Sequence, residues 1–299
     1  MRLPPVLFLL LFLSCAKGEV IDINNNGIIK VNESQVSVKK VGGYIPDSVF
    51  IDDKVIHGQG CAIVDNYLYR LFDGGYCSVF NINTIDDISY CHGFKLDSYS
   101  SFNHANCAQY DRISGLFYIS AFKERKCNVE SIDAINGSST LIQQIEIKES
   151  EVLGEGCLNV ICGDDGFLWA FGGPESGFGT LVFLKFRKPA ISLYDSGRII
   201  LDENDLVDLW RQDDIISVQG GVVKHGYLFF LSGSLTSNKK ILAYNTSTHE
   251  MEYLIILDDV VAEEPEDIDF WGNYLVVTVY GGSAYYALDM SELLYGSKQ

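Results

Sequence analysis

Short stretches dominated by apolar and aromatic residues recur along this chain, and Gly, Asn or Asp lie at most of their ends. Five groups of stretches share one order: a small or polar cluster with a short apolar run, then an aromatic-rich stretch, then a third apolar stretch. Runs of this length between turn residues are typical of β-strands. The pattern therefore predicts an all-β protein built from a repeated unit.

The central stretch of the unit is its clearest part. Its five copies are centred on Leu68, Phe117, Leu168, Leu228 and Leu275, and a period of about 50 residues suits one four-stranded blade of a β-propeller. We therefore expect one domain over residues 19–299, a five-bladed β-propeller of four-stranded blades. A β-sandwich with similar hairpins is the alternative at this stage.

The outer strands are less regular than the central ones. Segments 141–147 and 252–257 fit as fourth strands of the second and fourth units, whereas the fifth unit has none after Asp289. An open strand edge promotes aggregation and needs a cover. The strand-like segment Gln35–Val41 is therefore expected to close the ring by pairing with the last blade. Between the third and fourth units, Asp202–Trp210 is expected to form a short helix.

The beginning of the chain has the layout of an export signal. Arg2 precedes the apolar run Val6–Leu13, and small and polar residues follow as far as Gly18. The apolar run is too short to span a bilayer, which takes about 20 residues. We expect residues 1–18 to be a signal peptide and the remainder to be exported without an integral membrane segment.

Cys15 gives this signal two interpretations. The segment Phe12–Cys15 resembles the lipobox of bacterial lipoproteins, in which the cysteine is acylated and starts the mature chain. Acyl chains would then hold the protein on the cell envelope or the cell surface. Cleavage by an ordinary signal peptidase would instead leave a secreted protein. In both cases any association with a membrane depends on the lipid alone.

Composition and charge limit the classes of binding partner that the protein can have. Hydrophobic residues make up 47% of the chain, which is enough for a substantial core, and the formal net charge of −18 disfavours nucleic acid. Seven further cysteines are too sparse for a small disulfide scaffold and include no CxxC pair. We interpret most of them as buried thiols and expect no metal site.

The opening clusters supply the candidate site. The first strand of a propeller blade lines the axis, so equivalent positions in the five first strands form a ring. Side chains that can orient a ligand by hydrogen bonding are expected there. The candidate ligand-binding residues at this channel mouth are His57, Gln59, His104, Glu155, Gln219 and Glu266. Small and polar residues would also recur there merely because the axis is crowded, and that alternative stays open.

Two classes of function fit such a ring. The first is a binding or scaffold protein for a glycan, a peptide or a small molecule. The second is a hydrolase or cyclase, for which Glu155, Glu266, Asp267 and Asp269 could supply an acid and a base. The sequence has no Gly-x-Ser-x-Gly elbow, no His-Glu-x-x-His helix and no phosphate-binding glycine loop, and it identifies no cofactor.

Three blade openings carry a family resemblance: His57-Gly58-Gln59-Gly60, Asn103-His104-Ala105-Asn106 and Glu264-Pro265-Glu266. They resemble a family of exported propeller lipoproteins of gut Bacteroidetes over roughly residues 50–290, which implies a surface or periplasmic location. Plant-type glutaminyl cyclases are similar in having Gln-Gly or Glu-Gly at successive blade openings. Asn106 and Asp267 depart from that glycine, so no catalytic residue is carried over from the cyclases.

Overall fold

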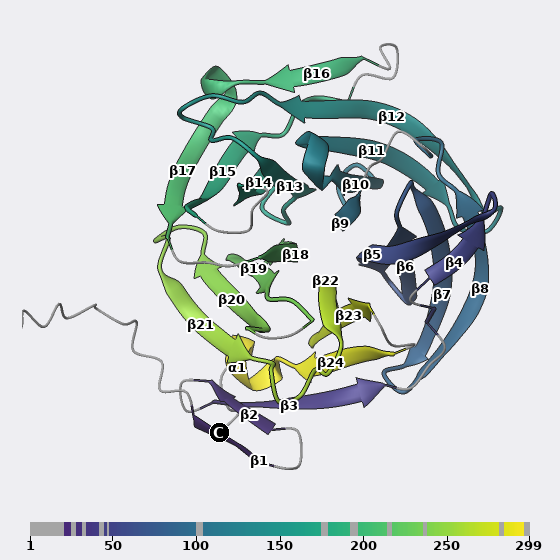
Figure 1. The fold of residues 1–299 in the computed structure, drawn as a ribbon, viewed down its shortest axis with the longest axis vertical. Helices are drawn as coiled ribbons and strands as arrows, with labels where there is room; N and C mark the ends of the chain where they lie inside the picture. The colour runs from purple at the N-terminus through teal and green to yellow at the C-terminus, as the bar shows by residue number, and fades with distance from the viewer. Residues whose placement is uncertain are drawn as a thin grey trace, which may run out of the picture.

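The computed structural model describes residues 21–24, 28–31, 34–41, 45–46, 48–99, 104–174, 179–191, 197–213, 217–235, 238–280 and 284–295. Five β-sheets stand radially around one axis in these residues (Figure 1). The protein is therefore the five-bladed propeller that the repeat predicted, and the β-sandwich is excluded. The signal segment, with Cys15, lies outside the described residues.

Each blade is an antiparallel sheet whose first strand is innermost. Blade 1 contains β5 (Lys54–Val64), β6 (Tyr67–Phe72), β7 (Tyr76–Thr84) and β8 (Asp87–Lys95). Blade 2 contains β9 (Ala105–Asp111), β10 (Leu116–Ala121), β11 (Lys126–Asp133) and β12 (Ser138–Ile147). Blade 3 contains β13 (Cys157–Cys162), β14 (Phe167–Gly173), β15 (Leu181–Arg187) and β17 (Leu206–Gln212). Blade 4 contains β18 (Val218–Lys224), β19 (Tyr227–Ser232), β20 (Lys240–Asn245) and β21 (Met251–Ile256).

Blade 5 is assembled from both ends of the chain. It contains β22 (Glu264–Trp271), β23 (Tyr274–Tyr280) and β24 (Tyr285–Asp289), and its fourth strand is β3 (Ser34–Val41). Strand β3 pairs antiparallel with β24, with Val41 opposite Tyr285 and Ser37 opposite Asp289. The predicted closure by the segment Gln35–Val41 is confirmed. Strands β2 (Ile28–Val31) and β1 (Ile21–Asn24) extend the same sheet outward.

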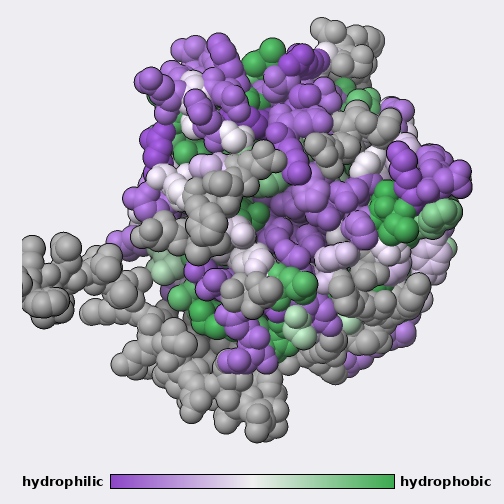
Figure 2. Space-filling view, in the orientation of Figure 1, coloured by the Kyte–Doolittle hydropathy of each residue, from purple (hydrophilic) through white to green (hydrophobic). Residues whose placement is uncertain are grey.

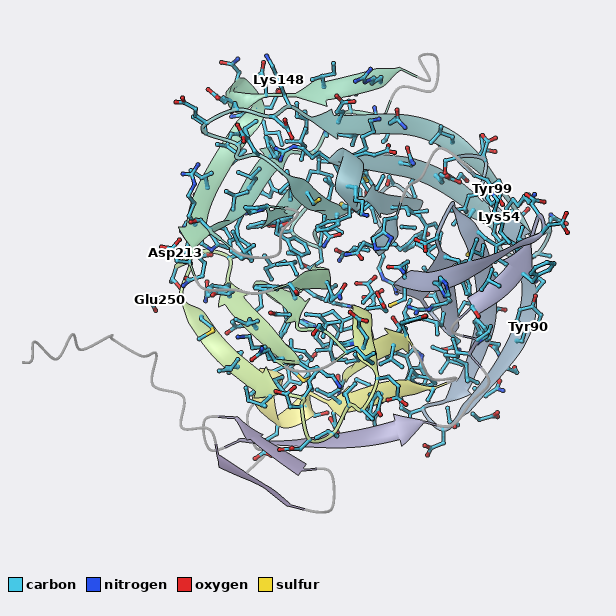
Figure 3. The ribbon with its side chains drawn as sticks, in the orientation of Figure 1. Lys54, Tyr90, Tyr99, Lys148, Asp213 and Glu250 are labelled. Atoms are coloured by element: carbon cyan, nitrogen blue, oxygen red, sulfur yellow. The ribbon has the colours of Figure 1, made fainter. Side chains whose placement is uncertain are left out.

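Two further strands widen blades 1 and 2. Strand β16 (Arg198–Leu201) pairs parallel with β12, and β4 (Ser48–Ile51) forms a hairpin with the start of β5. The β4–β5 hairpin lies over blade 1 on the viewer's side of Figure 1. Asp52 at its tip accepts a hydrogen bond of 3.0 Å from the Tyr99 hydroxyl, and Figure 3 shows Tyr99 beside Lys54 at the outer edge of the ring. The hairpin is therefore fastened to the blade beneath it.

The helix expected at Asp202–Trp210 is wrong. Only Glu203–Asp205 forms a single 3₁₀ turn, and Asp202 caps it by accepting from the backbone of Asn204. The rest of the segment is β17, the outer strand of blade 3. Its pairing with β15 shifts register between Lys185 and Phe186, which inserts an extra residue into β17. That bulge breaks the two-residue alternation and imitates helical spacing of the apolar residues.

The hydrophobic core is divided into five clusters, which lie between adjacent blades. The centres of the predicted repeat, from Leu68 to Leu275, are all buried in these clusters. Cys61, Cys77, Cys107, Cys127, Cys157 and Cys162 are buried, as expected, whereas Cys91 is exposed. No helix in the described part of the chain has the length and apolar character needed to cross a membrane.

Candidate functional site

Four of the five innermost strands contain a β-bulge close to the point where their pairing with the second strand of the blade begins. In β22 the extra residue is Glu266, and in β9 it is Asn106. In β5 and β18 the irregular positions include Gln59 and Gln219. Bulges turn side chains out of the ladder's alternation and are common beside functional sites. We call the end of the axis where the inner strands begin the axial mouth.

Hydrogen bonds between side chains and neighbouring blades run around the axial mouth and join all five blades. His104 Nδ1 of blade 2 lies 2.8 Å from Asp73 Oδ1 of blade 1. The remaining links are Asn106 Nδ2 to Asn159 Oδ1 (3.3 Å), Asn159 Nδ2 to the Gln219 carbonyl (2.8 Å), Gln219 Nε2 to Glu264 Oε1 (3.3 Å) and Arg70 Nη1 to Thr278 Oγ1 (2.6 Å). We call these residues the polar belt. Figure 2 shows hydrophilic side chains gathered around the centre of this face.

Arg70 is a positively charged member of the polar belt and is fully buried. Its guanidinium donates to the Gln59 carbonyl and, at 3.2 Å, to the Val279 carbonyl. A Cβ atom on Gly58 would lie 2.7 Å from Arg70 Nε, so the glycine leaves room for the guanidinium. Arg70 therefore fastens blade 1 to blade 5 at the place where the ring closes.

Inside the polar belt the axis is filled by contacts between blades. Asp267 Oδ2 accepts from the backbone N–H of Cys61 at 2.7 Å, and Cys107 Sγ donates to the Gly221 carbonyl at 3.0 Å. The second contact joins blade 2 to blade 4, which are not neighbours in the ring. A Cβ atom on Gly220 would lie only 1.9 Å from Asp267 Oδ1. Crowding at the axis therefore accounts for the recurring small residues.

The structure brings most of the sequence-predicted site residues to the axial mouth. Gln59 and Glu266 are buried, with 6% and 5% of their surface exposed, and Gln219 and His104 belong to the polar belt. His57 is half-buried against the edge of the Tyr280 ring, and its carbonyl accepts from the backbone of Asp73 at 2.9 Å.

Glu155 is the exception among the predicted residues. It is exposed and lies in the turn before β13, the one inner strand whose ladder with the next strand is regular throughout. Without a bulge the strand begins only at Cys157. No hydrogen bond or ion pair within the described residues ties Glu155 to the polar belt.

Sequence reasoning missed Arg70, Asp73 and Asn159. Arg70 and Asn159 are polar residues in otherwise apolar strands, β6 and β13. A buried polar residue needs a partner, so its place inside an apolar run was a usable signal. Asp73 carried no comparable signal because it lies in a turn. Within the described residues, no three His, Cys, Asp or Glu side chains are arranged to hold a metal ion.

Burial raises the pKa of all four acidic side chains of β22, Asp269 included. Burial raises the pKa of Glu266 well above its ordinary value, against the opposing effect of Arg70. Burial likewise raises the pKa of Asp267 far above the usual range and raises the pKa of Glu264. Desolvation penalises the charged form of a carboxyl group, so Glu266 keeps its proton to a higher pH than an exposed glutamate does. A neutral carboxyl group can donate a hydrogen bond or a proton.

The raised pKa of Glu266 predicts how stability depends on pH. A carboxyl whose pKa is higher in the folded state contributes stability that is complete below the unfolded pKa of about 4.3 and is lost as the pH rises through the folded pKa. Glu266→Gln, which mimics the protonated form, should match the natural protein near pH 4 and unfold at a higher denaturant concentration near pH 8. Chemical unfolding at both pH values measures this difference.

Glu250→Gln is the matched control for this comparison, because Glu250 is exposed at the outer edge of the ring (Figure 3). It should leave the pH dependence unchanged. Equal pH dependence in the natural protein and in Glu266→Gln would show that Glu266 ionises normally in the folded protein.

The fold and the site define the protein as a five-bladed propeller with a polar axial mouth. No protein-family model matches the chain, and no curated protein matches it. Solved structures with a similar fold include glutaminyl cyclase from Myxococcus xanthus, with 9% identity over 77% of this chain and 89% of that chain and a TM-score of 0.50. A nidogen/laminin complex has 8% identity over 82% and 85%, with a TM-score of 0.43. At these identities the likeness concerns the fold alone.

Proposed function

We propose that this protein is a binding propeller that holds a polar ligand at the axial mouth. The carrying observation is that groups from all five blades meet there while two buried polar atoms, Gln59 Oε1 and His57 Nδ1, have no partner among the described residues. Buried polar atoms in proteins are normally hydrogen-bonded. A glycan, a peptide or another small molecule would complete these contacts and be oriented by them.

One observation favours a second candidate function, a hydrolase or cyclase acting at the same place. Asp73 holds the imidazole of His104, which is the arrangement that orients a general base. Glu266, whose pKa is raised by burial, lies close enough to Asp73 for their charges to interact and could serve as the general acid. The fold of glutaminyl cyclase shows that a similar ring can belong to an enzyme, and supports no specific reaction here.

The proposed location follows from the start of the chain. The signal-like segment and the resemblance to exported propeller lipoproteins support a place in the cell envelope, with Cys15 acylated. Mass spectrometry of the mature protein's first residues tests the anchor. An unmodified residue after Cys15 at the N-terminus would show a secreted protein instead.

A ligand screen followed by substitution tests the binding function. Thermal-shift measurements with glycans, short peptides and small polar molecules should identify compounds that raise the melting temperature. Gln59→Leu removes the unpartnered oxygen and should weaken binding of such a compound about threefold to tenfold in calorimetric titration, as expected for one hydrogen bond. Asp65→Asn is the control, because Asp65 lies exposed in the β5–β6 turn at the other end of β5.

Two outcomes separate the candidate functions. Unchanged affinity in Gln59→Leu together with weakened affinity in Asp65→Asn would move the ligand to the opposite end of the axis and contradict the proposal. If the screen also yields a compound that the protein converts, His104→Gln should reduce turnover about a hundredfold or more while leaving affinity nearly intact. A pure binding protein would convert none of the compounds.

A further inference from the structure

The buried cations at the axial mouth already have partners. Arg125 donates to the carbonyls of Ile147, Lys148, Leu153 and Gly156, and Lys239 donates to those of Val261 and Ala262. Arg125 and Lys239 are each only 4% exposed, and Arg70 is fully buried with its bonds to blade 5. These three side chains stabilise loops and join blades. They leave little positive charge for a ligand to meet.

The axial mouth also contains hydrogen-bond acceptors that could bind a ligand. Asp73 is partly exposed, with 28% of its side chain accessible, and Glu264 is half-buried beside Glu266. The amide oxygen of Gln59 independently indicates a missing ligand. Only 6% of this residue's surface is exposed, and no group among the described residues donates a hydrogen bond to the oxygen. Gln59 lies at the bulge of β5, next to β22 and its bulge at Glu266. The missing partner is therefore a hydrogen-bond donor.

We propose that the axial mouth recognises a primary ammonium group on a small organic ligand. The inference rests on the proposed binding function and names the chemistry of its ligand. An ammonium group is compact and carries three donors and no acceptor, which matches an amide oxygen flanked by carboxyl groups. The ring of Tyr280, which meets His57 at a centroid distance of 5.1 Å, adds an aromatic face on which a cation can rest.

The charged groups around Glu266 couple binding of the ammonium group to the release of a proton from Glu266. Arg70 from β6 favours the ionised form of Glu266, whereas Asp73 from the following turn and Glu264 and Asp267 from β22 oppose it. Lys239, just before β20, acts on Glu264. A ligand cation placed among these groups adds positive charge, which lowers the pKa of Glu266 and releases its proton. Binding should therefore release protons to the buffer and tighten as the pH rises.

Calorimetric titration with paired probes tests the inference. Glucosamine and spermidine supply the ammonium group, and N-acetylglucosamine is the matched probe in which the amine of glucosamine is neutralised. We expect one amine to bind per protein, and the acetylated sugar to bind about tenfold to a hundredfold more weakly, as for loss of a charge-assisted hydrogen bond. The observed heat should differ between phosphate and HEPES, neither of which carries a primary amine, in the sense of proton release.

Substitutions then place the amine at the axial mouth. Glu266→Gln should weaken binding of the amine and abolish the buffer dependence of the binding heat. Glu250→Gln, at an exposed position, should do neither. If Glu266→Gln fails to fold, Glu264→Gln tests the loss of amine affinity alone, because Glu264 is half-buried and its amide isostere keeps an oxygen for Gln219. A loss of amine affinity confined to the mouth variants supports the inference.

Several results would overturn it. Equal or tighter binding of N-acetylglucosamine would exclude recognition of the amine, and so would unchanged amine affinity in both mouth variants. If the amines do not bind but a neutral or anionic compound from the screen does, and Gln59→Leu weakens that compound, the amine inference fails and the binding function survives. If no compound is sensitive to Gln59→Leu, both fail.

Discussion

A chain that begins at Gly42, after β3, is expected not to fold into a stable propeller. Strand β3 is the fourth strand of blade 5 and covers β24 along five residue pairs. Its removal leaves the N–H and C=O groups on the β3-facing edge of β24 without partners and opens an edge that favours association with another chain. The expected result in circular dichroism and size-exclusion chromatography is loss of the cooperative thermal transition, accompanied by aggregation.

A second truncation makes this result specific to β3. A chain beginning at Glu33 lacks β1 and β2, which lie outside β3 in the same sheet, but retains the closing strand. It should unfold cooperatively within a few degrees of the full chain. A cooperative transition at an unchanged temperature in the chain that begins at Gly42 would refute closure by β3.

Arg70→Met is expected to destabilise the folded protein by about 3–5 kcal/mol, the range for removing one member of a buried charged network. Methionine fills much of the same volume, but it leaves the carbonyls of Gln59 and Val279 and the hydroxyl of Thr278 without this donor. Glu266 also loses the positive charge that favours its ionised form. The midpoint of denaturant unfolding at neutral pH measures the loss.

Arg112→Met is the comparison, because the Arg112–Asp65 pair is 64% and 73% exposed on its two side chains. Exposed pairs of this kind contribute about 0–1 kcal/mol, so this variant should be nearly as stable as the natural protein. Equal losses in the two arginine variants would mean that Arg70 does not hold blade 5 to blade 1.

The central strands of the blades were predictable because their signal is local. Around Leu168 and Leu228, apolar residues run without interruption between turn residues, and no knowledge of their partners is needed. Strand β17 was not predictable in this way, since its bulge against β15 removes the alternation that marks a strand. The pattern of apolar residues therefore predicts a strand only where the strand's hydrogen-bonded pairing is regular.

The candidate site was predictable only in part, for a different reason. The bulged residues Gln59, Gln219 and Glu266 could be found because they recur at blade openings. Two of the three partners of Arg70, Thr278 and Val279, lie more than 200 positions away in the sequence, so its role depends on how the ring closes. Asp73 approaches His104 for the same reason, since the contact exists only once blades 1 and 2 are packed together.

The division of blade 5 between the two ends of the chain has a consequence for how the protein is made. Strand β3 is synthesised among the first segments and its partner β24 among the last. Pairing over nearly the whole length of a chain is slow, because the intervening loop must close before the contact forms. During synthesis the edge of β3 that will pair with β24 therefore stays unpaired, and a chaperone that shields this edge in that interval should raise the yield of native protein.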